Sequence, residues 1–269
     1  MIGWSRASGR RDPRTRIPPP DDPFQVTPFA IRPVLADAWA LFRRDRDWLL
    51  RVAGPFLFLP AFALALLVPT APVALLSGET NEAEALARAA KLADWMRAHG
   101  GWHLLANGMA LFGAAALQSA YLDRHAPDVG AALGRAGGLL PRYLLAMVIV
   151  AVPTGAGLYL WVLPGLYVMG RTMLVGPVLV AERPVSALGA VVRSFALSRG
   201  RGLPLMALAS TTVLGSLIVA QPFAALDLAA KRSVVAAVIE AAGMGAAAML
   251  AGIAQVLIAV AVYRRLGAR

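Results

Sequence analysis

The chain has 269 residues, of which 58% are hydrophobic and 15% are charged, and its mean hydropathy is +0.64. Soluble domains carry roughly 25% charged residues, so this composition excludes an ordinary water-soluble globule. The sequence contains no cysteine, and its three histidines lack the spacing of metal ligands, so we expect no disulfide, no metal site and no cofactor. The net charge is +11, which we attribute to membrane topology rather than to nucleic-acid binding.

The chain begins with a polar segment rich in arginine and proline, residues 1–27. This segment has too little apolar surface to offset the entropy lost on ordering, so we expect a disordered cytoplasmic tail. We expect the remaining residues, 28–269, to form one membrane domain.

Three amphipathic patterns follow along the chain, at residues 28–46, 127–138 and 184–200. Each places apolar side chains at helical spacing. The second opens with Asp128 as a cap and ends at Gly137-Gly138, and the third has Ser186 near its cap and stops at Gly200. Their exposed arginines predict helices that lie on the cytoplasmic surface of a membrane.

Six stretches are close to the roughly 20 apolar residues that a helix needs to cross a bilayer. Backbone groups in lipid must be satisfied within the segment, so we expect α-helices. The stretches are residues 48–68, 102–121, 143–162, 166–181, 203–221 and 233–263. The fourth is the shortest and contains Arg171 and Pro177, so it is either a short tilted crossing or a re-entrant segment.

The distribution of cations favours six crossings with both termini in the cytoplasm. In that topology 20 cations lie inside and 5 lie outside, as the positive-inside rule predicts for a bacterial inner membrane. The predicted fold is an all-α integral membrane protein with six transmembrane helices arranged as three hairpins, each preceded by a cytoplasmic amphipathic helix. A further helix is expected outside, within residues 79–99, where Asn81 and Glu84 resemble a capping box.

Two ionisable residues are candidates for a functional pair inside the membrane, Arg171 and Glu240. At about 1.5 Å per residue, both lie roughly 8 to 10 Å from the outer ends of their helices, which permits an ion pair. Two alternatives stay open: both side chains are solvated near the headgroups, or they belong to a substrate or ion site.

Polar contacts are also expected at two other places. Arginines of the cytoplasmic helices would lie near anionic headgroups, either to bind lipid or only to fix the topology. These candidates are Arg43, Arg44, Arg193 and Arg199. In the last crossing, small residues between 243 and 252 indicate close packing, and Gln255 and the hydroxyls of residues 210–212 are expected to bond across that interface.

Two runs of the sequence look like a known family. One is residues 37–44, and the other comprises Leu163-Pro164-Gly165-Leu166-Tyr167, Arg171, Gly176-Pro177-Val178, Glu182, Ala190 and residues 193–200. They resemble the membrane domain of glycerophosphoryl diester phosphodiesterases and related stand-alone bacterial inner-membrane proteins of unknown function. The resemblance covers about residues 28–263 and implies a membrane location. The resemblance also implies that, in the fused enzymes, catalysis belongs to a separate barrel domain with a metal site. We do not expect that domain in this chain.

Signatures of catalysis such as GxSxG or paired membrane aspartates in GxGD are absent from the sequence. We therefore expect a non-catalytic scaffold or accessory protein in envelope or lipid processes. Its expected partners are membrane lipids and other membrane proteins, and not nucleic acid. The alternative is a small-molecule or lipid transporter, which Arg171 and the proline-containing fourth stretch favour.

Overall fold

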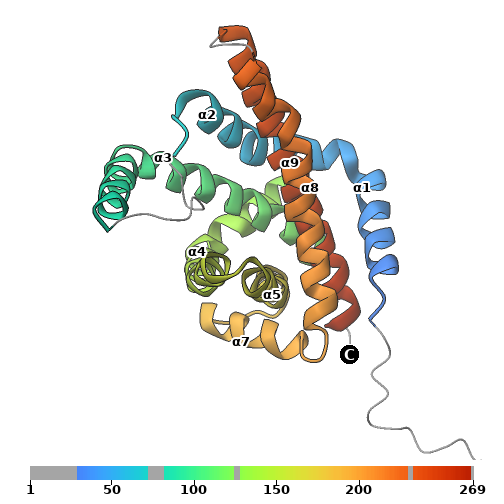
Figure 1. The fold of residues 1–269 in the computed structure, drawn as a ribbon. Helices are drawn as coiled ribbons and strands as arrows, with labels where there is room; N and C mark the ends of the chain where they lie inside the picture. The colour runs from blue at the N-terminus through green and yellow to red at the C-terminus, as the bar shows by residue number, and fades with distance from the viewer. Residues whose placement is uncertain (1–28, 72–81, 124–127, 230–232, 268–269) are drawn as a thin grey trace, which may run out of the picture.

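The computed structural model describes residues 29–71, 82–123, 128–229 and 233–267, and within these ranges the chain is all-helical. The expected all-α class is therefore confirmed. The predicted tail at residues 1–27 and the predicted cap Asn81 lie outside the described residues. Figure 1 shows α8 and α9 side by side, α1 along α9, and α7 below α4 and α5.

The first amphipathic helix and the first crossing form one helical segment with two irregular points. α1 (Ile31–Ala53) leaves helical geometry at Asp45, where φ is −115° and ψ is 16°. This is where the sequence predicts the change from surface helix to crossing. A π-helical turn, η1 (Gly54–Phe58), then leads into α2 (Leu59–Leu67). Pro55 is the second residue of that turn and cannot donate the backbone bond of a regular α-helix.

Two pairs of predicted helices are merged. α3 (Glu82–Leu122) joins the expected outer helix to the second predicted crossing, and α4 (Val129–Leu160) joins the second amphipathic pattern to the third crossing. The prediction that Gly137-Gly138 ends a helix is wrong, since both lie inside α4. Glycine costs a helix only about 1 kcal/mol relative to alanine, which tertiary packing offsets. The predicted cap is confirmed, with Asp128 accepting a hydrogen bond from the Ala131 N–H at 2.7 Å.

The next segment consists of α5 (Val162–Thr172), α6 (Val175–Ala181) and α7 (Ala187–Leu197). α7 confirms the third amphipathic helix, and the Ser186 hydroxyl accepts from the Gly189 N–H at 3.0 Å. The helix ends at Leu197, three residues before the predicted stop at Gly200, which has a φ of 74°. The sequence predicts an apolar stripe of Leu188, Val191, Val192 and Phe195 on this helix, and the packed face differs from it. Leu188 and Val192 are exposed, whereas the buried positions are Ala187, Ala190 and Ser194.

The last two helices, α8 (Gly202–Ala229) and α9 (Val234–Leu266), pack against each other. The predicted role of small residues in α9 is confirmed, because a Cβ at Gly243 would overlap the ring of Phe223, and Gly252 packs on Leu57. The predicted hydroxyl bonds across this interface are wrong. The side chains of Ser210, Thr211 and Thr212 each donate to a carbonyl of their own helix.

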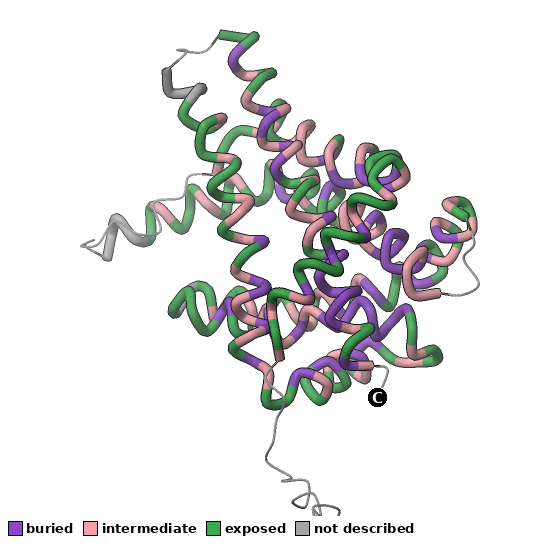
Figure 2. Tube along the Cα trace, turned by 90° about the vertical axis from the view of Figure 1, so that its right-hand side faces the viewer, coloured by how far each residue is buried: buried purple, intermediate pink, exposed green. Residues whose placement is uncertain are grey.

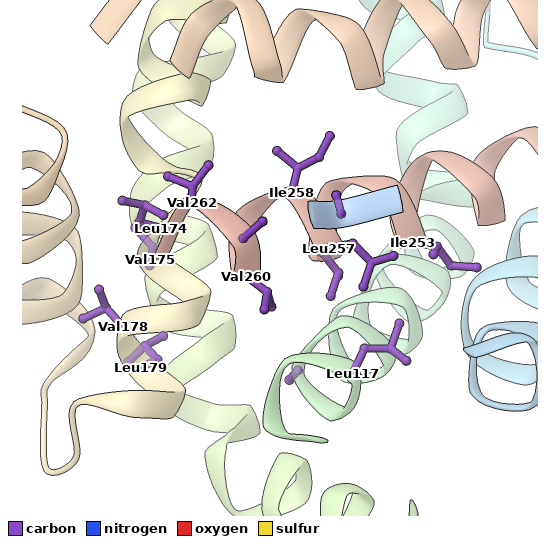
Figure 3. Packing of buried hydrophobic residues seen from close by; sticks show 14 of the residues in the cluster. Leu117, Leu174, Val175, Val178, Leu179, Ile253, Leu257, Ile258, Val260 and Val262 are labelled. Carbon is purple, nitrogen blue, oxygen red and sulfur yellow. The ribbon is translucent and has the colours of Figure 1, made fainter. Parts of the chain in front are cut away.

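The hydrophobic core is built around the C-terminal part of α9. Figure 3 shows Leu257, Val260 and Val262 of this helix among side chains from α3 and α6. In Figure 2 the buried positions lie where the helices meet, while outward faces and helix tips are exposed. Long apolar side chains on those outward faces, such as Ile218 and Val235, are what a protein surrounded by lipid presents.

Five helical segments are long and apolar enough to cross a membrane. They are Ile31–Leu67, Val129–Leu158, Val162–Ala181, Gly202–Ala225 and Val234–Leu266. The doubtful fourth stretch of the sequence lies within one of them. α3 is not among the five, because polar residues such as Asn107 and Gln118 interrupt its apolar run. The structure therefore supports a membrane protein and does not confirm the arrangement of six crossings in three hairpins.

Candidate functional site

A cavity of about 550 Å³, here called the central cavity, is lined by residues of η1, α2, α3, α4, α5, α6 and α9. Its volume lies within the range of roughly 300–1,000 Å³ that is usual for small-molecule sites. Most of the lining is apolar. The polar side chains in the lining are Asn107, Gln118, Tyr143, Thr154, Thr172 and Gln255. Among the described residues that line the cavity, none carries a charge.

Two buried polar side chains meet at one end of the central cavity. The Tyr143 hydroxyl of α4 donates to Gln118 Oε1 of α3 at 3.4 Å. Hydrogen bonds between oxygens are usually about 2.7–2.8 Å long, so this contact is weak. Gly176 of α6 leaves the space for it, since a Cβ there would lie 2.7 Å from the Tyr143 hydroxyl and closer still to Gln118 Oε1. We call these two side chains the Gln118–Tyr143 pair.

The other polar groups of the cavity differ in how far they are satisfied. The Thr172 hydroxyl donates to the Val168 carbonyl at 2.8 Å, and the Asn107 amide donates to the His103 carbonyl at 2.8 Å. The Thr154 hydroxyl, by contrast, is buried without a hydrogen-bond partner in the described structure. An unpaired buried polar group costs about 1–3 kcal/mol, so a ligand that pairs with Thr154 would be stabilised there.

None of the predicted site residues lines this cavity, although the sequence holds a signal for it. Asn107 and Gln118 are eleven residues apart, and so are Tyr143 and Thr154. Eleven residues are about three turns at 3.6 residues per turn, so each pair lies on one face of its helix. Two such polar stripes in two predicted crossings indicate faces turned away from lipid.

The structure places Arg171 in a contact between α5 and α7. Its Nη2 donates to the Phe195 carbonyl at 2.8 Å, while the Ser194 hydroxyl donates to the Arg171 carbonyl at 2.7 Å. The guanidinium also lies over the Phe195 ring, 5.1 Å from its centroid. Because the last carbonyls of a helix lack partners within the helix, each side chain satisfies a terminal carbonyl of the other helix. We call this reciprocal contact the α5–α7 clamp.

The predicted pair of Arg171 with Glu240 stays a prediction. In the described structure the hydrogen bonds and ring contacts of Arg171 go to Tyr167 and Phe195, and Glu240 lies in the first turns of α9. The sequence predicts Arg171 near the outer edge of the membrane and the third amphipathic helix, α7, on its inner surface. Because Arg171 is hydrogen-bonded to α7, these two expectations cannot both hold. The geometry assigns Arg171 a structural contact.

The four arginines proposed to face lipid fall into two groups. Arg44 donates to Asp45, with a shortest distance of 2.9 Å, and Arg193 donates to Glu182, also at 2.9 Å. Exposed ion pairs of this kind contribute about 0–1 kcal/mol. The other two arginines, Arg43 and Arg199, present their charges on the surface.

The end of α9 is tied to three other elements by consecutive residues. The Tyr263 hydroxyl donates to Glu182 Oε1 at 3.1 Å, just after α6. Arg264 donates to the Tyr121 carbonyl of α3 at 2.9 Å, and Arg265 donates to Asp37 of α1 at 2.6 Å. Successive helix positions point about 100° apart, so three neighbours in sequence reach three different partners. We call this set of contacts the α9-end network.

Within the described ranges, no group of three or more His, Asp and Glu side chains is arranged to hold a metal ion.

The fold and the central cavity define a broad class, all-helical proteins whose apolar helices are long enough to cross a membrane. Comparison of the chain with protein-family models, with curated proteins and with solved structures finds no match.

Proposed function

We propose that this protein is a non-catalytic polytopic protein of the bacterial inner membrane that binds an uncharged small molecule in its central cavity. In this role it would be an accessory in envelope or lipid processes. The observation that carries the proposal is the apolar lining with uncharged polar groups. A charged ligand would leave its charge buried without a partner in this lining, which is strongly unfavourable.

The proposed topology has six crossings, both termini in the cytoplasm, and α3 as the second crossing. The residues that lower the hydropathy of α3, Asn107 and Gln118, line the central cavity, so they need not face lipid. The excess of cytoplasmic cations supports the same topology. The relation to the membrane domains of glycerophosphoryl diester phosphodiesterases, suggested by residues 163–200, is part of this proposal.

The binding proposal can be tested by extracting what the purified protein retains. Protein exchanged into fresh detergent is extracted with organic solvent, and the extract is quantified by mass spectrometry. We expect about one uncharged molecule per chain from the natural protein and severalfold less from Ala110→Phe, which fills the cavity, and from the milder Thr154→Val. Leu104→Phe is the matched control on α3, because Leu104 is exposed and outside the lining. Equal amounts from all four proteins would contradict the proposal.

Transport is the second candidate function. Pro60 lines the central cavity, and Pro153 and Pro177 directly adjoin the lining residues Thr154 and Gly176. Proline-interrupted helices around a cavity are a feature of transporters. The protein would be reconstituted into vesicles with the molecule recovered above. Time-dependent accumulation inside the vesicles supports transport, whereas saturable binding without accumulation supports the accessory role.

A further inference from the structure

A second cavity, of about 570 Å³, lies between α2 and α3 and shares a wall with the central cavity. We call it the α2–α3 pocket. The residues that line both cavities are Pro60, Leu64 and Ala106. Of these, Ala106 is nearly buried and has the smallest side chain, so it forms the thinnest part of the shared wall.

The two cavities differ in chemistry. The α2–α3 pocket is lined by apolar side chains apart from His99 and Trp102, and the His99 ring already packs on Trp95. Leu67, Trp102 and Leu105 are largely exposed, so the pocket borders the outer face of the helices. The Gln118–Tyr143 pair lies at the other end, twelve residues along α3 from Ala106, which is roughly 18 Å at about 1.5 Å per residue. Only a molecule with a long chain would reach from this pair into the pocket.

We propose that the ligand is an uncharged lipid with one polar end. This inference rests on the proposed binding function and names its ligand class. The hydroxyl or carbonyl of the lipid pairs with Gln118 and Tyr143, and its apolar chain passes Ala106 and lies in the α2–α3 pocket, through which it enters from the bilayer.

The weak internal bond explains why this end of the cavity selects a head group. In the described structure, Gln118 accepts a bond through Oε1, and its Nε2 hydrogens are directed to no partner within the protein. The 3.4 Å contact from Tyr143 can be exchanged for a shorter one to a ligand oxygen. Moving an apolar chain from lipid into an apolar pocket changes its surroundings little, so selectivity depends on the head.

The test uses two photoreactive forms of a long-chain primary alcohol and the full-length protein in phosphatidylcholine nanodiscs. One probe carries its diazirine beside the hydroxyl, and the other carries it at the chain end. Labelled peptides are mapped by mass spectrometry, with excess hexadecanol to remove saturable labelling. We expect the head-side label near Gln118, Tyr143 or Gly176, and the chain-end label near Leu67, Trp102 or Leu105.

A variant separates the chain path from binding itself. Ala106→Phe fills the shared wall, so the competed chain-end label should leave the α2–α3 pocket, by about tenfold, while the head-side label stays. Ala106→Val is the second variant, for use if Ala106→Phe does not fold. It should reduce the chain-end label in the α2–α3 pocket less than Ala106→Phe does. Leu104→Phe, two residues away and outside both cavities, should label like the natural protein.

Competitors test the head group and the chain length. Ionised palmitate and octanol should each displace the head-side probe at least tenfold less well than hexadecanol, the first because it is charged and the second because its chain is short. Head-side labelling with no competed label in the α2–α3 pocket, or equal competition by palmitate or octanol, overturns this inference and leaves the proposed binding intact. No competed labelling by either probe overturns both.

Discussion

In the C-terminal half of α9, residues 256–262 are all buried, whereas in its N-terminal half Val234, Val235, Val238 and Ile239 are exposed. Seven consecutive residues make about two turns, so the buried half is packed on every side. α9 contacts α1, α3, α6, α8 and the segment from η1 to α2, and in its N-terminal half Gly243 packs on Phe223 of α8 and Gly245 on Phe58 and Phe62. Both halves are apolar in sequence, because protein core and lipid are both apolar surroundings. Hydropathy therefore locates a crossing without locating the core.

The strongest test of this contrast removes a large side chain from each half. Leu257→Ala should lower the free energy of unfolding by about 2–5 kcal/mol, because it leaves a cavity in the core. Val235→Ala is the control, and its effect should stay within about 0.5 kcal/mol, as for other exposed positions. Denaturant unfolding in mixed micelles measures both. Similar losses at the two positions would show that the halves do not differ as described.

Gly243→Ala sharpens the contrast by testing a close contact with α8 in the N-terminal half of α9. The added Cβ would overlap the Phe223 ring, and overpacking of this kind costs about 1–3 kcal/mol. Gly215→Ala in α8 is the matched control, since its Cβ would meet nothing within 4 Å. Because alanine favours helix over glycine, the control should be neutral or slightly stabilising. The same unfolding assay applies, and a neutral Gly243→Ala would remove the proposed α8–α9 contact.

A third variant tests the α9-end network. Tyr263→Phe removes the hydroxyl that donates to Glu182 and should cost about 0.5–1.5 kcal/mol. Tyr167→Phe, whose hydroxyl lies 3.5 Å from Arg171 Nη1, should cost less, because that contact is at the limit of a hydrogen bond. A larger loss of stability for Tyr167→Phe than for Tyr263→Phe would show that the contact of Tyr167 with Arg171 stabilises the protein more than the contact of Tyr263 with Glu182 does.

The smallest effect is expected for the exposed pair of Arg265 with Asp37. Although the shortest distance is 2.6 Å, both side chains are 40% exposed or more, so Arg265→Gln should cost at most about 1 kcal/mol. The difference from the natural protein should shrink as salt is raised. A loss that is unchanged in high salt would indicate packing rather than charge attraction.

Local features of the fold were predictable because they depend on a few neighbouring residues. The cap at Ser186, the cap at Asp128 and the positive φ of Gly200 after α7 follow from short-range backbone chemistry. The lengths of α3 and α4 did not follow, because Gly137 and Gly138 end a helix only where no packing offsets their cost.

The candidate site was predicted less well. Charged residues at membrane depth drew attention to Arg171 and Glu240, yet Arg171 satisfies carbonyl and ring partners in α5 and α7. The central cavity uses uncharged side chains instead, from helices far apart in the sequence. Helical spacing places Asn107 and Gln118 on one face, but it cannot say that the face meets Tyr143 of α4.

The amino-acid sequence by itself determined that this protein is helical and suited to lipid, because composition and the backbone's need for internal hydrogen bonds leave little alternative. Only the tertiary structure decided which apolar face of α9 meets protein, and that polar groups of α3 and α4 meet at Gly176. The physical reason is that packing depends on the shapes of side chains brought together from distant segments. Hydropathy carries little information about this packing, because lipid and protein core offer an apolar side chain much the same surroundings.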